Sequence, residues 1–167
     1  QAIEGVVRIR LGSVEPRLIT DEFISRIKPL DKLCDHFHLS LQSGSDTVLR
    51  RMNRKYSADE YFHAVEKLRE IYDRPSITTD IIVGFPGETD EEFNQTMAFV
   101  NKVKFSEIHV FQFSKREGTP AATMSDQVDH SVKKARSEAL IALAHQLSDD
   151  YKNAVIENQL EILIEEY

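Results

Sequence analysis

Four short runs of apolar residues, partly alternating with polar ones, are each followed by a segment with apolar residues at helical spacing. The short runs are typical of strands and comprise residues 6–15, 36–43, 77–85 and 108–114. The amphipathic segments begin near Thr20, Ser57, Asp90 and Ser131. Because a helix follows every strand, the pattern predicts an α/β fold in which right-handed crossovers join parallel strands.

Capping residues indicate where the helices begin. Thr20 precedes two acidic residues, which favour the first turn of a helix, and Pro29 ends that helix. Capping-box spacing marks two further helix starts, at Ser57 with Glu60 and at Thr89 with Glu92. We therefore expect the helices to start close to these positions.

The length of the chain limits how many strand–helix units it contains. A closed eight-unit barrel takes about 250 residues, or about 31 per unit. The 167 residues therefore accommodate four units, with a hydrophobic content of 41% that suffices for one core. We predict a partial (β/α) barrel or a small open sheet. Three other segments are expected as a loop rich in Arg and Lys before Ser57, a loop around Gly118, and a last strand at Leu160–Ile164.

The two faces of the predicted strands differ in polarity. In the second strand Phe37, Leu39 and Leu41 share one face, and the polar residues between them share the other. Thr78 and Asp80 face the same way in the third strand, and the first strand sets Val7, Ile9 and Leu11 against two arginines. If helices cover the apolar face, the polar residues line an open hollow. An antiparallel sheet with one solvated face is the alternative, and the helix after each strand argues against it.

Polar segments stand at the carboxyl end of each predicted strand. They comprise residues 13–15, 42–44, 84–88 and 114–119. The third segment is a Gly-Phe-Pro-Gly turn that leads into a capped helix, and glycine permits sharp turns and close approach of a ligand. Active sites of parallel barrels form at this end of the strands. The four segments together predict a binding site there.

Charge and cysteine content exclude several classes of protein. The formal net charge of −7 argues against a surface built mainly to grip nucleic acid. The single cysteine, Cys34, excludes an internal disulfide framework or a cysteine-rich metal site within the chain, and we interpret it as a buried small apolar residue. No apolar run approaches the about 20 residues of a membrane span. The chain does not begin with methionine, so we expect it to start inside a larger protein.

Four motifs stand at or near the strand ends: HLSLQSGS at residues 38–45, RMNRKY at 51–56, TDIIVGFPGET at 79–89 and FSKREGTPA at 113–121. These motifs resemble those of the radical S-adenosylmethionine methylthiotransferases, which insert a methylthio group into tRNA adenosine or a ribosomal protein. RLGSVEP at 10–16 and HFH at 36–38 look most like the branch that acts on threonylcarbamoyladenosine at tRNA position 37. The isopentenyladenosine branch is next, and the ribosomal-protein branch fits least because Ser43-Gly44 replaces its histidine-alanine pair.

This resemblance implies a partial barrel of six βα units, of which residues 1–157 supply the last four. Residues 158–167 then begin a linker or strand toward an RNA-binding domain. The implied cofactors are S-adenosylmethionine and [4Fe-4S] clusters, whose CxxxCxxC ligands belong to a preceding unit. The implied partners are a tRNA substrate and a cellular electron donor, in the cytoplasm. We expect the isolated chain to show no turnover.

The resemblance also assigns residues to S-adenosylmethionine. Ser13, Glu15, Gln42 and Ser43 end the first two strands, where the family binds the ribose or the methionine portion. Arg54 is expected to pair with the methionine carboxylate; alternatively, it belongs to a solvated basic loop. Ile82 and Gly84 are expected along the adenine. Asp80 is either a polar contact or an anchor for Arg8 or Arg10. Glu88 is shifted by one position from the wider superfamily pattern GxIxGxxE, which argues against a direct role.

Two further hypotheses concern partners. Lys115 and Arg116 are expected to approach tRNA phosphate or the substrate base, unless they form an ordinary surface loop. An exposed edge at Val7–Leu11 predicts self-association, because unpaired strand edges invite pairing. The rival functions are a non-catalytic nucleotide-binding half-barrel and, with less support, an aldolase-like barrel that uses Lys115.

Overall fold

The structure is a computed structural model and describes residues 2–156 and 158–159. Its strands form one parallel sheet in the order β1-β2-β3-β4. The strands are β1 (Ser13–Val14), β2 (His36–Leu39), β3 (Ser76–Val83) and β4 (Glu107–Gln112). The predicted α/β fold with parallel strands is thereby confirmed.

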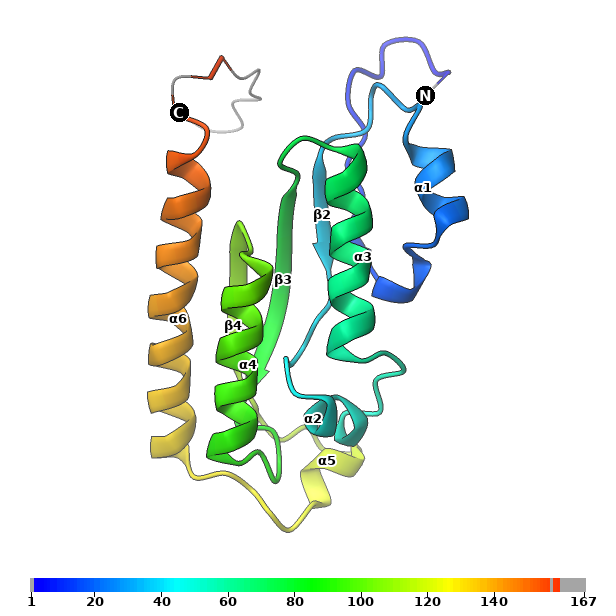
Figure 1. Ribbon diagram of the computed structural model, residues 1–167. Helices are drawn as coiled ribbons and strands as arrows, with labels where there is room; N and C mark the ends of the chain where they lie inside the picture. Colours follow the sequence, from blue (N-terminus) through cyan, green and yellow to red (C-terminus); the bar gives the residue numbers. More distant parts are fainter. Residues whose placement is uncertain (1, 157, 160–167) are drawn as a thin grey trace.

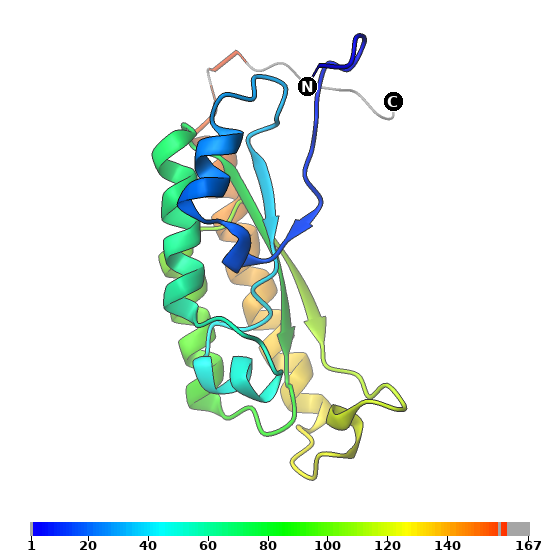
Figure 2. The same ribbon diagram turned by 90° about the vertical axis from the view of Figure 1, so that its right-hand side faces the viewer.

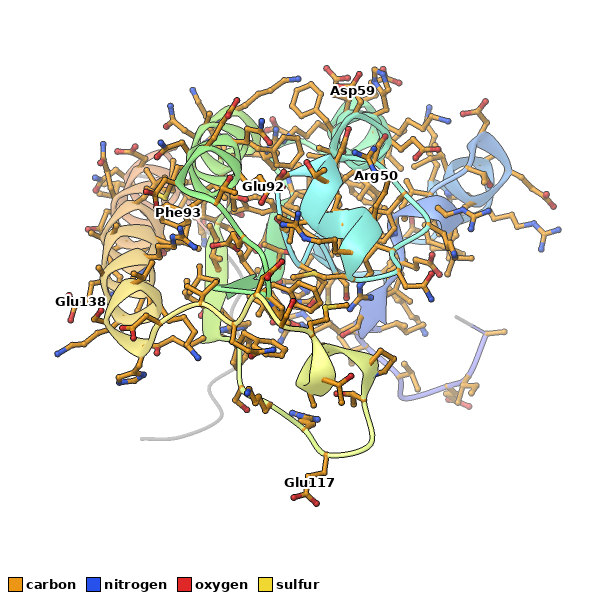
Figure 3. All side chains as sticks on the ribbon, turned by 90° about the horizontal axis from the view of Figure 1, so that it is seen from below. Arg50, Asp59, Glu92, Phe93, Glu117 and Glu138 are labelled. Atoms are coloured by element: carbon orange, nitrogen blue, oxygen red, sulfur yellow. The ribbon has the colours of Figure 1, made fainter. Side chains whose placement is uncertain are left out.

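Helices cover only one face of this sheet (Figures 1 and 2). The layer consists of α1 (Asp21–Ile27), α3 (Ala58–Ile71), α4 (Asp90–Val103) and α6 (His130–Asn153). Seen along the strands in Figure 3, these helices form an arc around the sheet, as in a barrel that stops part-way round. Three short helices are also present in the described residues, η1 (Pro16–Leu18), α2 (Asp46–Arg51) and α5 (Pro120–Thr123). In Figure 1 α2 and α5 lie at the lower end, below the end of β3.

The hydrophobic core lies between the sheet and the helix layer. Phe37, Leu39 and Leu41 point into it and are fully buried, as the alternation predicted. Tyr61 of α3 is buried among them, and its hydroxyl donates a hydrogen bond to the Leu39 carbonyl at 3.0 Å. Each such apolar side chain stabilises the fold by about 1.5–3 kcal/mol through burial. The stability of the fold therefore comes mainly from this side of the sheet.

Most helix starts agree with the prediction. The Thr20 hydroxyl accepts a hydrogen bond from the Phe23 N–H. Ser57 and Thr89 both form complete capping boxes, each with the glutamate three residues later. The last long helix begins at His130, capped by Asp129, one residue before the predicted start.

The predictions were wrong at the edge strand and in two loops. Residues 6–12 contribute only one isolated bridge, Ile9 with Leu33, and the regular strand is limited to Ser13–Val14. The expected basic loop contains the short helix α2, and the Gly118 loop leads into α5. Leu160–Ile164 lies outside the described residues, so the boundary at residue 157 stays a prediction. Self-association through residues 7–11 also stays a prediction.

The face of the sheet opposite the helices carries His38, Thr78, Asp80 and His109 and is called the open face below. Val7 and Phe111 are large apolar residues that remain exposed, at 72% and 53%. The open face is therefore the part of the sheet available for binding.

Among the helices that the structure describes, none combines the length and the apolar character that crossing a bilayer requires.

Candidate functional site

The ends of β2, β3 and β4 open into a cavity of about 540 Å³, called the C-terminal cavity below. Gln42, Asp80 and Arg116 supply polar lining, and Ile82 supplies an apolar wall. Three phenylalanines also line the cavity, Phe85, Phe111 and Phe113. A pocket of this size with a mainly apolar lining and few polar groups is typical of a cofactor site. The predicted hollow shared by Gln42 and Asp80 is confirmed.

Gln42 adopts a strained backbone conformation at the rim of this cavity. Its φ of 72° lies in the left-handed region, which costs a residue other than glycine about 1–3 kcal/mol. The segment nevertheless rejoins the sheet, because the Gln42 N–H donates to the Asp80 carbonyl at 2.9 Å and its carbonyl accepts from the Ile82 N–H at 3.0 Å. Only 8% of Gln42 is exposed. This left-handed backbone conformation therefore accompanies the placement of the Gln42 side chain at the cavity.

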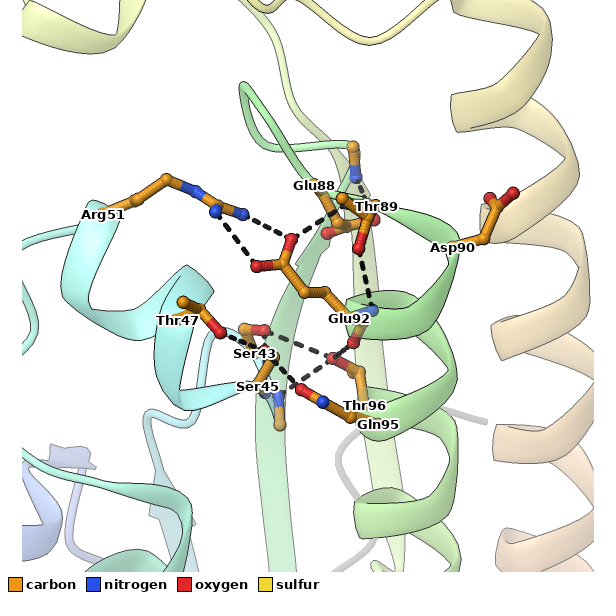
Figure 4. A network of polar contacts seen from close by, with 12 residues as sticks. Ser43, Ser45, Thr47, Arg51, Glu88, Thr89, Asp90, Glu92, Gln95 and Thr96 are labelled. Atoms are coloured by element: carbon orange, nitrogen blue, oxygen red, sulfur yellow. Dashed lines mark hydrogen bonds and ion pairs between the residues drawn. The ribbon is translucent and has the colours of Figure 1, made fainter.

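Ser43 points away from the C-terminal cavity. Its hydroxyl lies 3.2 Å from the Thr96 hydroxyl on α4 and accepts a hydrogen bond from the Ser45 N–H (Figure 4). Ser45 in turn donates to Gln95 at 2.7 Å. The structure thus places the Ser43 side chain in the contact between α4 and the segment after β2. Its predicted role toward the cofactor stays a prediction.

Arg51 joins α2 to the start of α4. Its guanidinium donates two hydrogen bonds to Glu92, at 3.0 and 2.6 Å, and Glu92 also caps its own helix through the Thr89 N–H (Figure 4). Burial raises the pKa of Glu92, but the hydrogen bonds from Arg51 and Thr89 outweigh it and lower the pKa. This pair positions the turn that precedes α4.

Glu88 and Gly84 form a second structural contact near the cavity. The Glu88 carboxylate accepts hydrogen bonds from Arg136 on α6 at 2.9 Å and from the Gly84 N–H at 3.0 Å. Gly84 has a φ of 71°, and a Cβ there would lie 2.1 Å from Cγ of Lys133. Glycine is therefore required by the close approach of α6. Glu88 is thus engaged in contacts inside the protein, and the expectation that it has no direct role stays a prediction.

Tyr56 is held just beyond the end of β2 by hydrogen bonds from its hydroxyl group. Its hydroxyl donates to the Ser40 and Leu41 carbonyls at 2.7 and 3.1 Å, beyond the end of β2. Burial raises the pKa of Tyr56 to about 12, with opposite smaller effects from the charges of Arg54 and Glu15. Arg54 is exposed and has no ion pair within residues 2–156 and 158–159, so its guanidinium is available to an anion.

A second cavity, of about 440 Å³, lies on the open face and is called the histidine cavity below. Ser13 lines it together with His36, His38 and His109, and Asp80 borders both cavities. The Asp80 carboxylate lies 3.3 Å from Nε2 of His38. Arg10 contacts His36 instead, at 3.0 and 3.1 Å. Asp80 thus contacts His38, and both alternatives for Asp80, a polar contact to the cofactor and an anchor for an arginine, stay predictions.

The loop after β4 contains the two predicted substrate-binding residues. Lys115 and Arg116 are both exposed, and Arg116 lines the C-terminal cavity whereas Lys115 does not. Figure 3 shows this loop, with Glu117 at its tip, projecting below the sheet on the side away from the helices. Their roles toward tRNA stay predictions.

Sequence reasoning missed His109 and the phenylalanine wall. Glu107, His109 and Phe111 alternate along β4, and this alternation would have placed all of them on the open face. Phe85 and Phe113 stack edge to face with centroids 5.2 Å apart. Aromatic rings in this position offer an apolar surface to a flat heterocycle.

Comparison with known proteins identifies the family. The profile described as the radical SAM superfamily matches residues 3–100. The chain belongs to the radical SAM superfamily. The solved structure of coproporphyrinogen III oxidase (HemN) from Escherichia coli, a radical SAM enzyme, matches with a TM-score of 0.70 at 22% identity, over 84% of this chain and 32% of that one. This likeness supports the fold as a partial barrel.

Curated relatives of this radical SAM chain are tRNA-modifying enzymes. Identity is 49% to the threonylcarbamoyladenosine tRNA methylthiotransferase MtaB of Bacillus subtilis, and 45% to that of Thermotoga maritima. It is 47% to the tRNA-2-methylthio-N(6)-dimethylallyladenosine synthase of Thermoanaerobacter pseudethanolicus. The matches cover 98%, 100% and 98% of this chain but only 36%, 38% and 35% of those proteins. The chain thus spans about a third of the length of these relatives.

The superfamily implies two cofactors, and the residues present fit one of them. S-adenosylmethionine has a flat base, a polar ribose and a carboxylate, which match the phenylalanine wall, Gln42 with Asp80, and the available guanidinium of Arg54. A [4Fe-4S] cluster needs several thiolates. Cys34, the one cysteine, precedes β2 at the end of the sheet opposite Gln42, and it does not fit such a site. It is partly exposed, so its interpretation as a buried residue was wrong.

Proposed function

We propose that this chain is a segment of a tRNA methylthiotransferase that modifies C2 of N6-threonylcarbamoyladenosine at position 37. In this proposal the segment binds S-adenosylmethionine and approaches the tRNA, while the cluster ligands belong to another part of the longer protein. The names of the relatives at 45–49% identity support the reaction class. S-adenosylmethionine supplies the radical and methyl chemistry once bound, and the residues of this chain bind, orient and shield it.

The observation that carries the proposal is the strained conformation of Gln42. A left-handed glutamine whose amide lines a cavity is costly for folding alone, and such outliers gather at binding sites. In our assignment Gln42 and Asp80 bind the ribose hydroxyls and Ile82 packs against the adenine. Arg54 pairs with the methionine carboxylate at the rim, with Glu15 nearby to accept a hydrogen bond from the amino group.

Titration of the chain with S-adenosylmethionine, followed by NMR, tests this assignment. Arg54→Ala should weaken binding at least about tenfold, because a carboxylate loses a charge-assisted pair. Lys55→Ala is the matched control, since Lys55 is an exposed neighbour whose ammonium bonds Asn53 at 2.7 Å. Equal affinity for all three proteins would remove Arg54 from the site.

Gln42→Gly separates a binding role from a structural one. Glycine accepts a φ of 72° without strain, so the free energy of unfolding should be unchanged or higher by about 1 kcal/mol. Affinity for S-adenosylmethionine should fall at least tenfold, because the amide is removed. A variant that binds as well as the parent chain would contradict the role of Gln42.

The nucleoside substrate decides between two branches. The relative at 47% identity is named for dimethylallyladenosine and supports that nucleoside as the alternative substrate. Mass spectrometry of nucleosides from tRNA, with and without the gene, separates the two. Loss of the methylthio group from threonylcarbamoyladenosine supports our proposal, and loss from dimethylallyladenosine alone supports the alternative. Unchanged tRNA would favour a non-catalytic nucleotide-binding half-barrel.

The isolated chain is expected to have no turnover. With Cys34 as its one thiolate it cannot surround a four-iron cluster. Anaerobic reconstitution with iron and sulfide should therefore leave the chain without the broad visible absorbance of a cluster. A stoichiometric cluster on this chain would refute the expectation, while the binding measurements above would still stand.

A further inference from the structure

Three potential metal ligands from neighbouring strands meet on the open face. The alignment of the parallel strands sets His38 of β2 opposite Thr78 of β3, and Asp80 of β3 opposite His109 of β4. One ligand atom from each of His38, Asp80 and His109 lies within 4.8 Å of the other two. We propose that these three side chains bind a divalent first-row transition metal ion such as Zn²⁺.

The distances suit a metal of this class. Zinc lies about 2.0–2.2 Å from nitrogen and oxygen ligands, so two ligands on a tetrahedral ion are about 3.3 Å apart. The Nε2 atom of His38 and the Asp80 carboxylate oxygen are separated by 3.3 Å. A ligand atom of His109 lies within 4.8 Å of those of His38 and Asp80. His109 is exposed, and its ring stacks on that of His38 with centroids 6.0 Å apart.

The neighbouring residues orient this set. The hydroxyl of Thr78 lies 3.0 Å from Nδ1 of His38, and Thr78 is only 4% exposed. Such a contact on the second ring nitrogen fixes the ring and directs Nε2 toward a metal. His36 is on the same face, but Arg10 lies against both of its nitrogens. His36 is therefore engaged and is left out of the proposed ligand set.

The charge of the cavity also favours a cation. The histidine cavity contains one positive residue, Arg10, and two negative ones, Asp80 and Glu107. Two imidazoles and one carboxylate leave coordination positions open, as in sites that bind Fe²⁺, Co²⁺ or Zn²⁺. These positions face the cavity, where water or a donor atom of a bound molecule completes the coordination. The site uses no cysteine, shares Asp80 with the ribose contact proposed above, and goes beyond that function.

Calorimetric titration of the metal-free chain with Zn²⁺ tests the proposal. We expect one tight ion per chain, and a loss of affinity of at least about tenfold in His109→Ala and in Asp80→Asn. Cobalt provides a second measurement, because Co²⁺ bound to these ligands should show visible absorption bands that both variants lose. His109 is exposed, so its variant should keep the circular dichroism and unfolding curve of the parent chain.

His63→Ala is the matched control. His63 lies 3.1 Å from Glu66 on the exposed side of α3, so it offers a surface histidine–carboxylate pair without a third ligand. Its affinity for Zn²⁺ should stay within twofold of the parent chain. The proposal is overturned if a folded chain binds no Zn²⁺, if His109→Ala binds as tightly as the parent, or if His63→Ala loses as much affinity as His109→Ala.

Discussion

Replacing Arg136 with methionine should leave the Glu88 carboxylate buried without its cationic partner. The side chains of Arg136 and Glu88 are 8% and 3% exposed, and their contact is 2.9 Å long. Removing one partner of a buried ion pair costs about 3–5 kcal/mol, because the other charge stays in a medium that solvates it poorly. For a chain of this length each kcal/mol lowers the midpoint of thermal unfolding by about 2–4 °C, so we expect a fall of roughly 6–20 °C.

Chemical denaturation followed by circular dichroism measures the loss in free energy of unfolding. Three further variants make the test sharper: Glu88→Gln alone, Glu88→Gln combined with Arg136→Met, and Arg26→Met. Glu88→Gln in the same chain should recover much of the loss, because the residue left behind is then neutral. Arg26→Met is the control, since Arg26 forms an exposed pair with Glu22 and should change stability by at most about 1 kcal/mol. A cost below about 1 kcal/mol for Arg136→Met, or additive costs of the two single changes in the double variant, would refute the reasoning.

The same variant has a predictable pH dependence. Burial raises the pKa of Glu88, and the Gly84 N–H and Arg136 lower it in part. Without Arg136 the pKa of the folded state rises further above the unfolded value of about 4.3. A folded carboxyl pKa above the unfolded value destabilises the fold progressively as the pH rises from the unfolded pKa to the folded pKa, and fully above the folded pKa. The deficit of Arg136→Met should therefore shrink between pH 8 and pH 5.

Two further predictions concern the turn before α4. Gly84→Ala should destabilise the fold by at least about 1 kcal/mol more than Gly118→Ala; both glycines have positive φ, but only at Gly84 would the new Cβ meet another side chain, that of Lys133. Comparison of the two unfolding curves checks this, and equal losses would contradict it. The lowered pKa of Glu92 means that its pair with Arg51 stabilises the fold above the unfolded pKa of about 4.3 and is lost as the pH falls through the folded value. Arg51→Met should therefore reduce the loss of stability between pH 5 and pH 3, by about 1 kcal/mol, in acid titrations followed by fluorescence or circular dichroism.

The sequence predicted the regular elements well where local chemistry determines them. Capping boxes at Ser57 and Thr89 fixed two helix starts because a side chain three residues away completes each box. The short helix α2 was missed since six residues show too little of a helical period, and its buried Val48 and Leu49 are adjacent. The first strand was overestimated, because its extent depends on a partner strand that local sequence does not specify.

The site was predictable only as far as strand alternation holds. Asp80 and Ile82 were placed at the C-terminal cavity because β3 is regular up to Val83. Ser43 follows Gln42, whose left-handed backbone lies beyond the end of β2, and the Ser43 side chain points toward α4. Backbone strain of this kind has no local sequence signal, since glutamine rarely adopts it. The exposure of Arg54 likewise depends on the geometry of the loop between α2 and α3, which the local sequence does not specify.

Because the helices cover one side of the sheet, that side stabilises the fold and the other side is available to ligands. The hydrophobic core that stabilises the fold lies between the strands and the helices, around residues such as Phe37 and Leu68. Residues in front, such as Asp80 and His109, can be exchanged at little thermodynamic penalty. A scaffold organised in this way can acquire new ligand preferences by mutation while its interior stays unchanged.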